Sequence, residues 1–242
     1  MPNDYFSFKQ FTVFHGKCAM KVGTDGVLIG AWTHIEAGQR VLDIGTGTGI
    51  IALMLAQRGA GEVMAVDIDE GAVEQAIDNV SSSKWADRIG VKRMDVSKKD
   101  EYEALRARFD VIVSNPPYFV EQVKCPDQGR HTARHTDALS FEALLDAASY
   151  MLTAEGEFSV VLPADTLSDF VTIAYRSGLK LKRQTWVHTK MGKHPKRILL
   201  AFGKGDIASS VTDHLYMLDK EGNTCEAYKM LVDEFYLDRQ HR

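Results

Sequence analysis

The chain has 242 residues, of which 45% are hydrophobic and 26% charged. This is the composition of an ordinary globular protein, and the length predicts one large domain or one domain with an extension. A disordered or low-complexity chain is excluded. The longest uncharged stretch, Ile44 to Gln57, is too short and too rich in glycine to span a bilayer, and the N-terminus lacks the pattern of a signal peptide. Three widely spaced cysteines argue against disulfides and zinc sites, so we expect a cytoplasmic protein.

Short strand-like runs alternate with amphipathic helical stretches from residue 40 onward. Strands are expected at Val41–Ile44, Val63–Asp67, Val91–Asp95, Asp110–Ser114, Phe158–Leu162, Thr185–His188 and Arg197–Phe202. Helices are expected at Ile50–Arg58, Glu70–Val80, Tyr102–Arg108, Phe141–Leu152 and Thr166–Ser177. This alternation predicts an α/β fold, with a mostly parallel sheet and helices on both of its faces.

The last two expected strands follow each other with no room for a helix between them. The junction predicts a hairpin, so we expect one antiparallel strand to end the sheet. After a linker at residues 203–213, the tail at 215–237 is expected to add a strand and a final helix. We expect a single domain over residues 1–242: an N-terminal cap on the cofactor and substrate (1–39), a core (40–205) and a small C-terminal extension (206–242).

A glycine-rich turn follows the first expected strand, in Asp43-Ile44-Gly45-Thr46-Gly47-Thr48-Gly49-Ile50. Glycines permit a positive φ and the close approach of a ligand, and the free N–H groups of a helix start favour polar groups. Ile50 occupies the third-glycine position of the dinucleotide fingerprint, which weakens a nicotinamide or flavin interpretation. Asp43 would repel a pyrophosphate, whereas it suits a ligand with a positive charge.

Two further carboxylates are expected at neighbouring strand ends. Asp67 ends the second expected strand, where it can accept hydrogen bonds from both ribose hydroxyls. Asp95 ends the third, where it can accept one from an adenine amino group. The pattern predicts that S-adenosylmethionine is the cofactor. The residues predicted to bind it from the pattern are Asp43, Gly45, Gly47, Gly49, Asp67 and Asp95.

The fourth expected strand runs directly into Asn115-Pro116-Pro117-Tyr118. Successive prolines lack N–H groups, so the turn offers carbonyl acceptors without competing donors. The Asn115 side chain and the Pro116 carbonyl can hold both hydrogens of a planar –NH2 group, on which Tyr118 can stack. Such acceptors favour pyramidalisation of the nitrogen and stabilise its developing positive charge. These four residues therefore predict methylation of an amino nitrogen, with no need for a triad, a metal or a strong base.

These motifs resemble those of Rossmann-like methyltransferases that act on amino nitrogens. Lys21 to Trp32, Arg130 to His135 with Leu139-Ser140-Phe141, and the tail around Tyr236-Leu237 are similar to segments of the bacterial tRNA1(Val) adenine-N6 methyltransferases. The resemblance extends from about residue 6 to residue 237 and implies a Rossmann-like methyltransferase sheet. It also implies N6-methylation of the adenosine next to the anticodon, with Thr24 over the methionine part of the cofactor.

A basic segment lies between residues 180 and 197 of a chain whose net charge is −4. It contains seven cations and no acidic residue: Lys180, Lys182, Arg183, Lys190, Lys193, Lys196 and Arg197. We favour a face that contacts RNA phosphates, with Lys190, Lys193 and Arg197 as substrate-binding residues; a solvated hairpin is the alternative.

The loop after the Asn-Pro-Pro-Tyr turn holds further candidates. Arg130 and Arg134 are expected to bind the substrate, although a mobile surface loop is an equal alternative. His131 and His135 have zinc-ligand spacing but no third ligand nearby, so no metal is expected. The expected partner is tRNA, with no membrane and no obligate protein partner.

Other functions fit parts of this pattern. Guanine-N2 methylation of ribosomal RNA uses a related motif and is the nearest alternative. Protein glutamine-N5 methylation uses the same chemistry on an amide, but such enzymes usually carry a sizeable helical domain before the glycine motif. DNA adenine methylation would normally need a separate target-recognition domain. An RNA chaperone that binds the cofactor would not need Asn115 or Tyr118.

Overall fold

The computed structural model describes residues 4–17, 21–117 and 139–237. An eight-stranded sheet forms its centre, in the order β10-β8-β9-β7-β6-β3-β4-β5. Its strands are β3 (Arg40–Ile44), β4 (Glu62–Asp67), β5 (Ile89–Arg93), β6 (Phe109–Ser114), β7 (Leu152–Pro163), β8 (Lys180–His188), β9 (Arg197–Gly203) and β10 (Val211–Tyr216). A separate hairpin pairs β1 (Tyr5–Ser7) with β2 (Thr12–Phe14).

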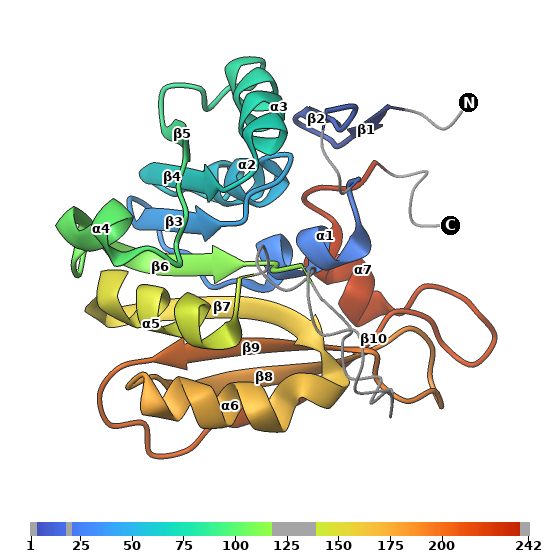
Figure 1. Cartoon of the computed structure of the whole chain (residues 1–242). Coiled ribbons are helices and arrows are strands. Elements are labelled where there is room, and N and C mark those ends of the chain that lie inside the picture. Colours follow the sequence, from blue (N-terminus) through green and yellow to red (C-terminus); the bar gives the residue numbers. More distant parts are fainter. Residues whose placement is uncertain (1–3, 18–20, 118–138, 238–242) are drawn as a thin grey trace, which may run out of the picture.

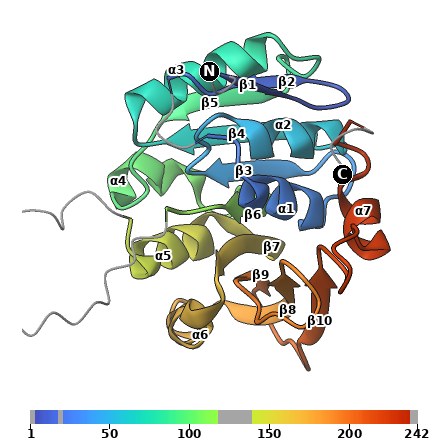
Figure 2. The same ribbon diagram turned by 90° about the vertical axis from the view of Figure 1, so that its right-hand side faces the viewer.

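Helices cover both faces of the sheet (Figures 1 and 2). One face carries α1 (Thr24–Trp32), α2 (Ile50–Gln57), α3 (Glu70–Ser81) and α7 (Glu226–Val232). The other carries α4 (Lys99–Tyr102), α5 (Phe141–Met151) and α6 (Leu167–Arg176). This arrangement confirms the predicted α/β fold. None of the helices in the described part of the chain is long and apolar enough to cross a membrane.

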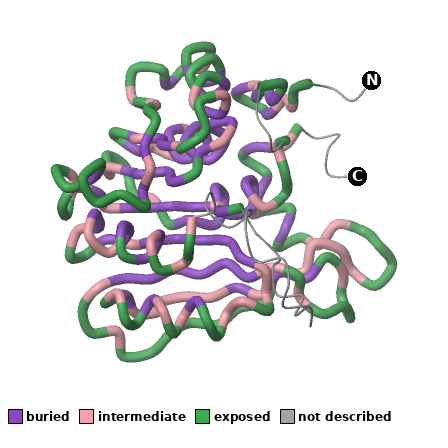
Figure 3. The backbone as a smooth tube through the Cα atoms, in the orientation of Figure 1, coloured by how far each residue is buried: buried purple, intermediate pink, exposed green. Residues whose placement is uncertain are grey.

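Strand β6 shows why the centre of the sheet is buried. Val111 and Val113 belong to the apolar cluster on the α1–α2 face, whereas Ile112 belongs to the cluster on the α5–α6 face. All three are at most 2% exposed, and Figure 3 shows the central strands buried along most of their length. A continuous apolar run is expected of a parallel strand that is covered on both sides.

The predicted hairpin is present, but its antiparallel strand does not end the sheet. Strand β9 pairs antiparallel with both β7 and β8, and β10 pairs parallel with β8. The crossover through α6 places β8 two positions from β7, so that β9 fits between them. The prediction that the antiparallel strand lies at the edge was therefore wrong: β8 and β10 lie outside it.

Several expected boundaries also differ from the structure. Strand β5 ends at Arg93, two residues before Asp95, because Asp95 accepts hydrogen bonds from the Ser97 N–H and hydroxyl in a turn. The helix expected over 102–108 begins earlier, as the short α4, and continues only as a 3₁₀ turn at Glu103–Leu105. In the tail, β10 begins at Val211, inside the expected linker.

Candidate cofactor and catalytic site

The carboxyl ends of β3, β4 and β6 lie at one edge of the sheet, because these strands are parallel (Figure 1). We call this the catalytic edge. Loops at this edge of an open α/β sheet form the ligand crevice. Three of the predicted motifs lie where these strands end: the glycine turn, Asp67 and Asn115.

The glycine turn adopts a backbone conformation that needs its glycines. Gly45, Gly47 and Gly49 have φ values of 72°, 55° and 80°, a region that other residues rarely adopt. The N–H groups of Gly45 and Thr46 both donate to the Val66 carbonyl, at 2.9 and 3.0 Å. These bonds hold the turn against the end of β4, where the cofactor ribose is expected.

Asp43 is a buried carboxyl beneath this turn, with 0% exposure. The Thr46 hydroxyl donates to its Oδ2 at 2.6 Å, whereas Oδ1 has no hydrogen bond of good geometry in the described part of the chain, although the Ala52 N–H lies near the carboxyl. Burial raises its pKa to about 7, against the opposing effect of the Thr46 hydroxyl. Because burial makes this carboxyl costly to ionise, a nearby cation would stabilise its charged form.

Asp67 lies directly beside the glycine turn, as predicted. Its Oδ2 accepts a hydrogen bond from the Gly47 N–H at 2.9 Å, and its Oδ1 accepts one from the Asp69 N–H at 3.0 Å. Each carboxylate oxygen can accept a further bond, so both oxygens remain able to receive ribose hydroxyls.

Asp95 is held differently from the expectation. It lies beyond the end of β5, and its carboxylate is engaged by Ser97 and by Lys98 Nζ at 3.3 Å. The hydrogen bonds from Ser97 lower its pKa further than burial raises it. The side chain is 17% exposed, and it lies in a turn rather than at a strand end.

Asn115 follows β6 and is half-buried, with Pro116 buried and Pro117 exposed. The neighbouring Ser114 hydroxyl donates to the Ile44 carbonyl at 2.9 Å, which ties the end of β6 to the end of β3. Asn115 thus directly follows a strand end that is hydrogen-bonded to β3, next to the glycine turn. The remaining predicted residues of this region, Tyr118, Arg130 and Arg134, lie outside the described residues.

The first turn of α1 packs against both motifs. A Cβ added to Gly26 would lie 3.4 Å from Ile50 Cγ2 and 4.0 Å from Asn115 Nδ2. Thr24 begins this helix and is exposed. The structure therefore brings Thr24 to the same side of the site as Asn115.

Two buried amides of α3 support the glycine turn, and they were not among the predicted site residues. Asn79 is 1% exposed; its amide accepts from the Phe14 N–H and donates to the carbonyls of Phe14 and Thr48. Gln75, one helical turn earlier, accepts from the Lys17 N–H at 3.0 Å. These bonds hold the segment 14–17 along α3 and link it to the glycine turn. Their position on the buried stripe of α3, with Ala72 and Ala76, is the signal that reveals them.

The basic segment divides into paired and unpaired cations. Four of its seven cations form ion pairs: Lys180 with Asp206, Lys182 and Arg183 with Glu157, and Arg197 with Asp25. Lys190, Lys193 and Lys196 form no ion pair with any residue that the structure describes. These three lie in or beside the loop between β8 and β9, at the catalytic edge.

Two histidines anchor that loop. His188 Nδ1 lies 2.8 Å from the Lys193 carbonyl oxygen, and His188 Nε2 lies 3.0 Å from His214 Nδ1. Because a carbonyl can only accept, His188 Nδ1 donates, and a neutral His188 then accepts at Nε2 from His214. The Met191 N–H also donates to the Leu218 carbonyl at 2.8 Å. The unpaired cations are therefore presented on a loop with a defined conformation.

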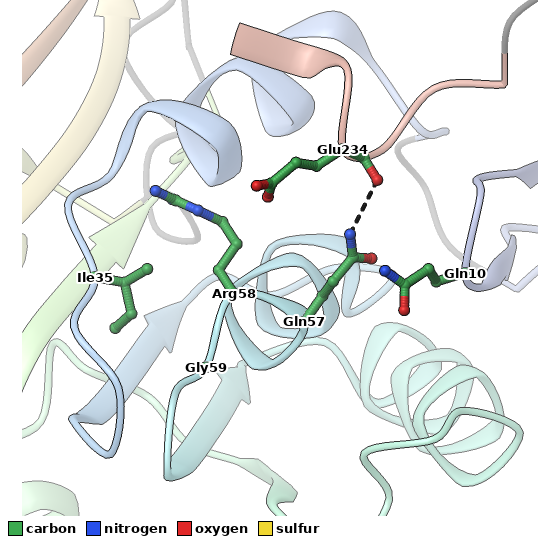
Figure 4. Close-up of a pocket in the computed structure, with 6 residues that line it drawn as sticks. All are labelled: Gln10, Ile35, Gln57, Arg58, Gly59 and Glu234. Carbon is green, nitrogen blue, oxygen red and sulfur yellow. Dashed lines mark hydrogen bonds between the residues drawn. The ribbon is translucent and has the colours of Figure 1, made fainter. Parts of the chain in front are cut away.

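An open pocket of about 630 Å³ lies away from this site. Figure 4 shows its lining, which comes from the C-terminal end of α2 and neighbouring loops: Gln10, Ile35, Gln57, Arg58, Gly59 and Glu234. Arg58 Nη1 donates to the Gly30 and Thr33 carbonyls at 3.0 and 2.6 Å. The pocket thus lies beside the hydrogen bonds that cap the C-terminal end of α1. The glycine turn lies at the other end of α2, its N-terminus.

The fold and the catalytic edge define a Rossmann-like methyltransferase, and the family model for the methyltransferase small domain matches residues 19–169. The chain is 52% identical over 238 residues to a tRNA1(Val) (adenine(37)-N6)-methyltransferase of Phocaeicola vulgatus, covering 98% of this chain and all of the relative. A relative of the same name from Bacteroides fragilis is 47% identical, covering 98% of this chain and 99% of the relative. The chain belongs to the family of tRNA1(Val) (adenine(37)-N6)-methyltransferases.

Solved structures support the fold. A protein from Agrobacterium tumefaciens, described as a predicted O-methyltransferase, superposes with a TM-score of 0.68 at 21% identity, over 87% of this chain and 96% of that one. Among the residues that the structure describes, no three His, Cys, Asp or Glu side chains are grouped to hold a metal ion. The family uses S-adenosylmethionine as its methyl donor.

Proposed function

We propose that this protein methylates N6 of the adenosine next to the anticodon of tRNA1(Val). The observation that carries the proposal is the position of Asn115: it follows a central strand directly beside the glycine turn, in a chain that matches the named relatives over nearly its whole length. Because the substrate is a tRNA, we place this activity in the cytoplasm.

Three groups support a cofactor site at the catalytic edge. The buried Asp43 carboxyl favours a cationic group, and the Asp67 oxygens suit the ribose hydroxyls. The positive-φ glycines leave the turn without side chains that would obstruct the ligand. S-adenosylmethionine supplies a methyl group already activated on a sulfonium, so the protein need only orient and polarise the nucleophile. Residues 1–39 would cap this site through Thr24 and the segment held by Asn79.

Asn115 is proposed to act on the adenine amino group. Its amide oxygen accepts a hydrogen bond from one N–H, and the Pro116 carbonyl accepts the other. The lone pair of the nitrogen is then less delocalised into the ring and points toward the methyl donor. Because the nitrogen becomes cationic during transfer, both bonds strengthen in the transition state.

The reaction itself is tested by methyl transfer to total tRNA, followed by mass identification of the modified nucleoside. N6-methyladenosine is the expected product. N2-methylguanosine in ribosomal RNA or a methylated glutamine in a protein, with unmodified tRNA, would instead support one of the alternatives.

The role of Asn115 is tested by Asn115→Ala. Loss of one acceptor that acts mainly in the transition state should lower the single-turnover rate by roughly 10²–10³, or about 2.7–4 kcal/mol, by analogy with an oxyanion-hole donor. Cofactor and tRNA binding, measured separately, should change little. A normal rate would leave the Pro116 carbonyl and substrate orientation as the source of catalysis.

A further inference from the structure

The ion pair between Asp25 and Arg197 joins the first turn of α1 to the beginning of β9. Arg197 Nε donates to Asp25 Oδ2 at 2.7 Å, and the two side chains are only 34% and 24% exposed. Arg197 pairs in register with Pro163, the last residue of β7. The ion pair therefore lies at the catalytic edge.

Among the residues that the structure describes, the start of α1 has few other anchors. Its N-cap is Gly23, which provides no side-chain hydrogen bond, and the bond from the Val27 N–H to the Gly23 carbonyl is long, at 3.4 Å. The C-terminal end of the helix is held by Arg58, which donates hydrogen bonds to the Gly30 and Thr33 carbonyls. Asp25 also lies in the first turn of α1, where its negative charge interacts favourably with the helix dipole and stabilises the helix.

The same turn lies next to Asn115. A Cβ added to Gly26, the residue after Asp25, would come within 4.0 Å of Asn115 Nδ2, so little space separates the turn from the Asn115 amide. A shift of the turn toward Asn115 would therefore crowd its amide, and a shift away would leave the amide space to move. Errors of about 1 Å in a reacting geometry can cost on the order of 10²-fold in rate.

We propose that Asp25 and Arg197 are positioning residues for methyl transfer. Their ion pair holds the first turn of α1 in place beside Asn115, and Arg197 serves this purpose rather than contacting an RNA phosphate. The inference rests on the proposed role of Asn115.

The experiment compares Arg197→Met and Asp25→Asn with Arg40→Met. Arg40 forms a similar ion pair with Asp110 at 3.0 Å, with side chains 43% and 28% exposed, but at the opposite ends of β3 and β6. We expect single-turnover rates about 10- to 100-fold lower for both site variants, at saturating cofactor and tRNA, and a wild-type rate for the control. Asp25→Asn keeps the shape of the side chain, so the test stands even if Arg197→Met folds poorly.

Two further measurements separate positioning from other roles. In the Asn115→Ala background, Arg197→Met should cause a much smaller additional loss of rate, because the ion pair acts through Asn115. The slope of log tRNA affinity against log salt should stay at the wild-type value. An additive loss of rate would overturn the proposal, as would normal rates in both single variants.

A salt slope lowered by about 0.7–0.9 with a normal rate would show that Arg197 is a phosphate contact, which also overturns the proposal. The proposed function fails independently: a normal rate in Asn115→Ala alone refutes the role of Asn115. A slow Asn115→Ala together with normal Arg197→Met and Asp25→Asn refutes only the positioning role.

Discussion

The glycine turn and the C-terminal part of the basic segment lie at the same edge of the sheet, yet the two motifs differ in how their residues are used. In the glycine turn, each predicted group has a place that follows from backbone conformation: three positive-φ glycines, and Asp67 bonded to the Gly47 N–H. In the basic segment, four of seven cations are neutralised by acidic residues from distant parts of the chain. A local motif defines a local geometry, whereas a run of charge does not define its partners.

Among the variants that test this difference between the two motifs, Asp67→Ala should have the largest effect, on cofactor affinity. Asp67→Ala removes the carboxylate that accepts hydrogen bonds from two ribose hydroxyls. Each hydrogen bond to a charged group contributes about 1.5 kcal/mol or more to the binding free energy, so cofactor affinity should fall roughly 100-fold. Calorimetry measures it. Asp87→Ala changes an exposed carboxylate far from the site and is the control. Unchanged affinity would mean that Asp67 only supports the turn through Gly47 and Asp69.

The success and the errors of the sequence analysis have the same physical origin. The sheet, the glycine turn and Asn115 could be predicted because strand ends and turn glycines depend on residues close in sequence. The edge position of the antiparallel strand could not, because pairing between β9 and β7 depends on where the α6 crossover places β8. The partner of Arg197 lies 172 residues away, and no local pattern marks it.

A smaller effect is expected at the unpaired cations. Replacing Lys190 and Lys193 by alanine should lower the slope of log tRNA affinity against log salt by about 1.4–1.8, from 0.7 to 0.9 for each lost phosphate contact. Affinity at moderate salt should weaken on the order of tenfold. Cofactor affinity should stay the same.

The matched control replaces Lys84 and Lys92, two exposed lysines near α3 and β5, by alanine. It removes the same charge without altering the loop between β8 and β9, so its salt slope should be that of the wild type. If both double variants behave alike, the loop between β8 and β9 is a solvated hairpin and the tRNA binds elsewhere.

The smallest expected effect concerns the pH dependence of cofactor binding at Asp43. Burial raises its pKa from 3.8 to about 7 in the folded protein. The folded state therefore holds more protons than the unfolded state between these values, and stability without cofactor should fall as pH rises from about 4 to 7.

Cofactor affinity should change in the opposite direction, because the ionised carboxyl attracts the cationic ligand. If only the ionised form binds, affinity should rise about fivefold between pH 6 and 7, as the ionised fraction grows. Asp43→Asn cannot ionise and should abolish both trends, as seen in calorimetry and thermal unfolding across this range. A wild-type affinity that is flat with pH, while stability still varies, would place the cationic part of the cofactor away from Asp43.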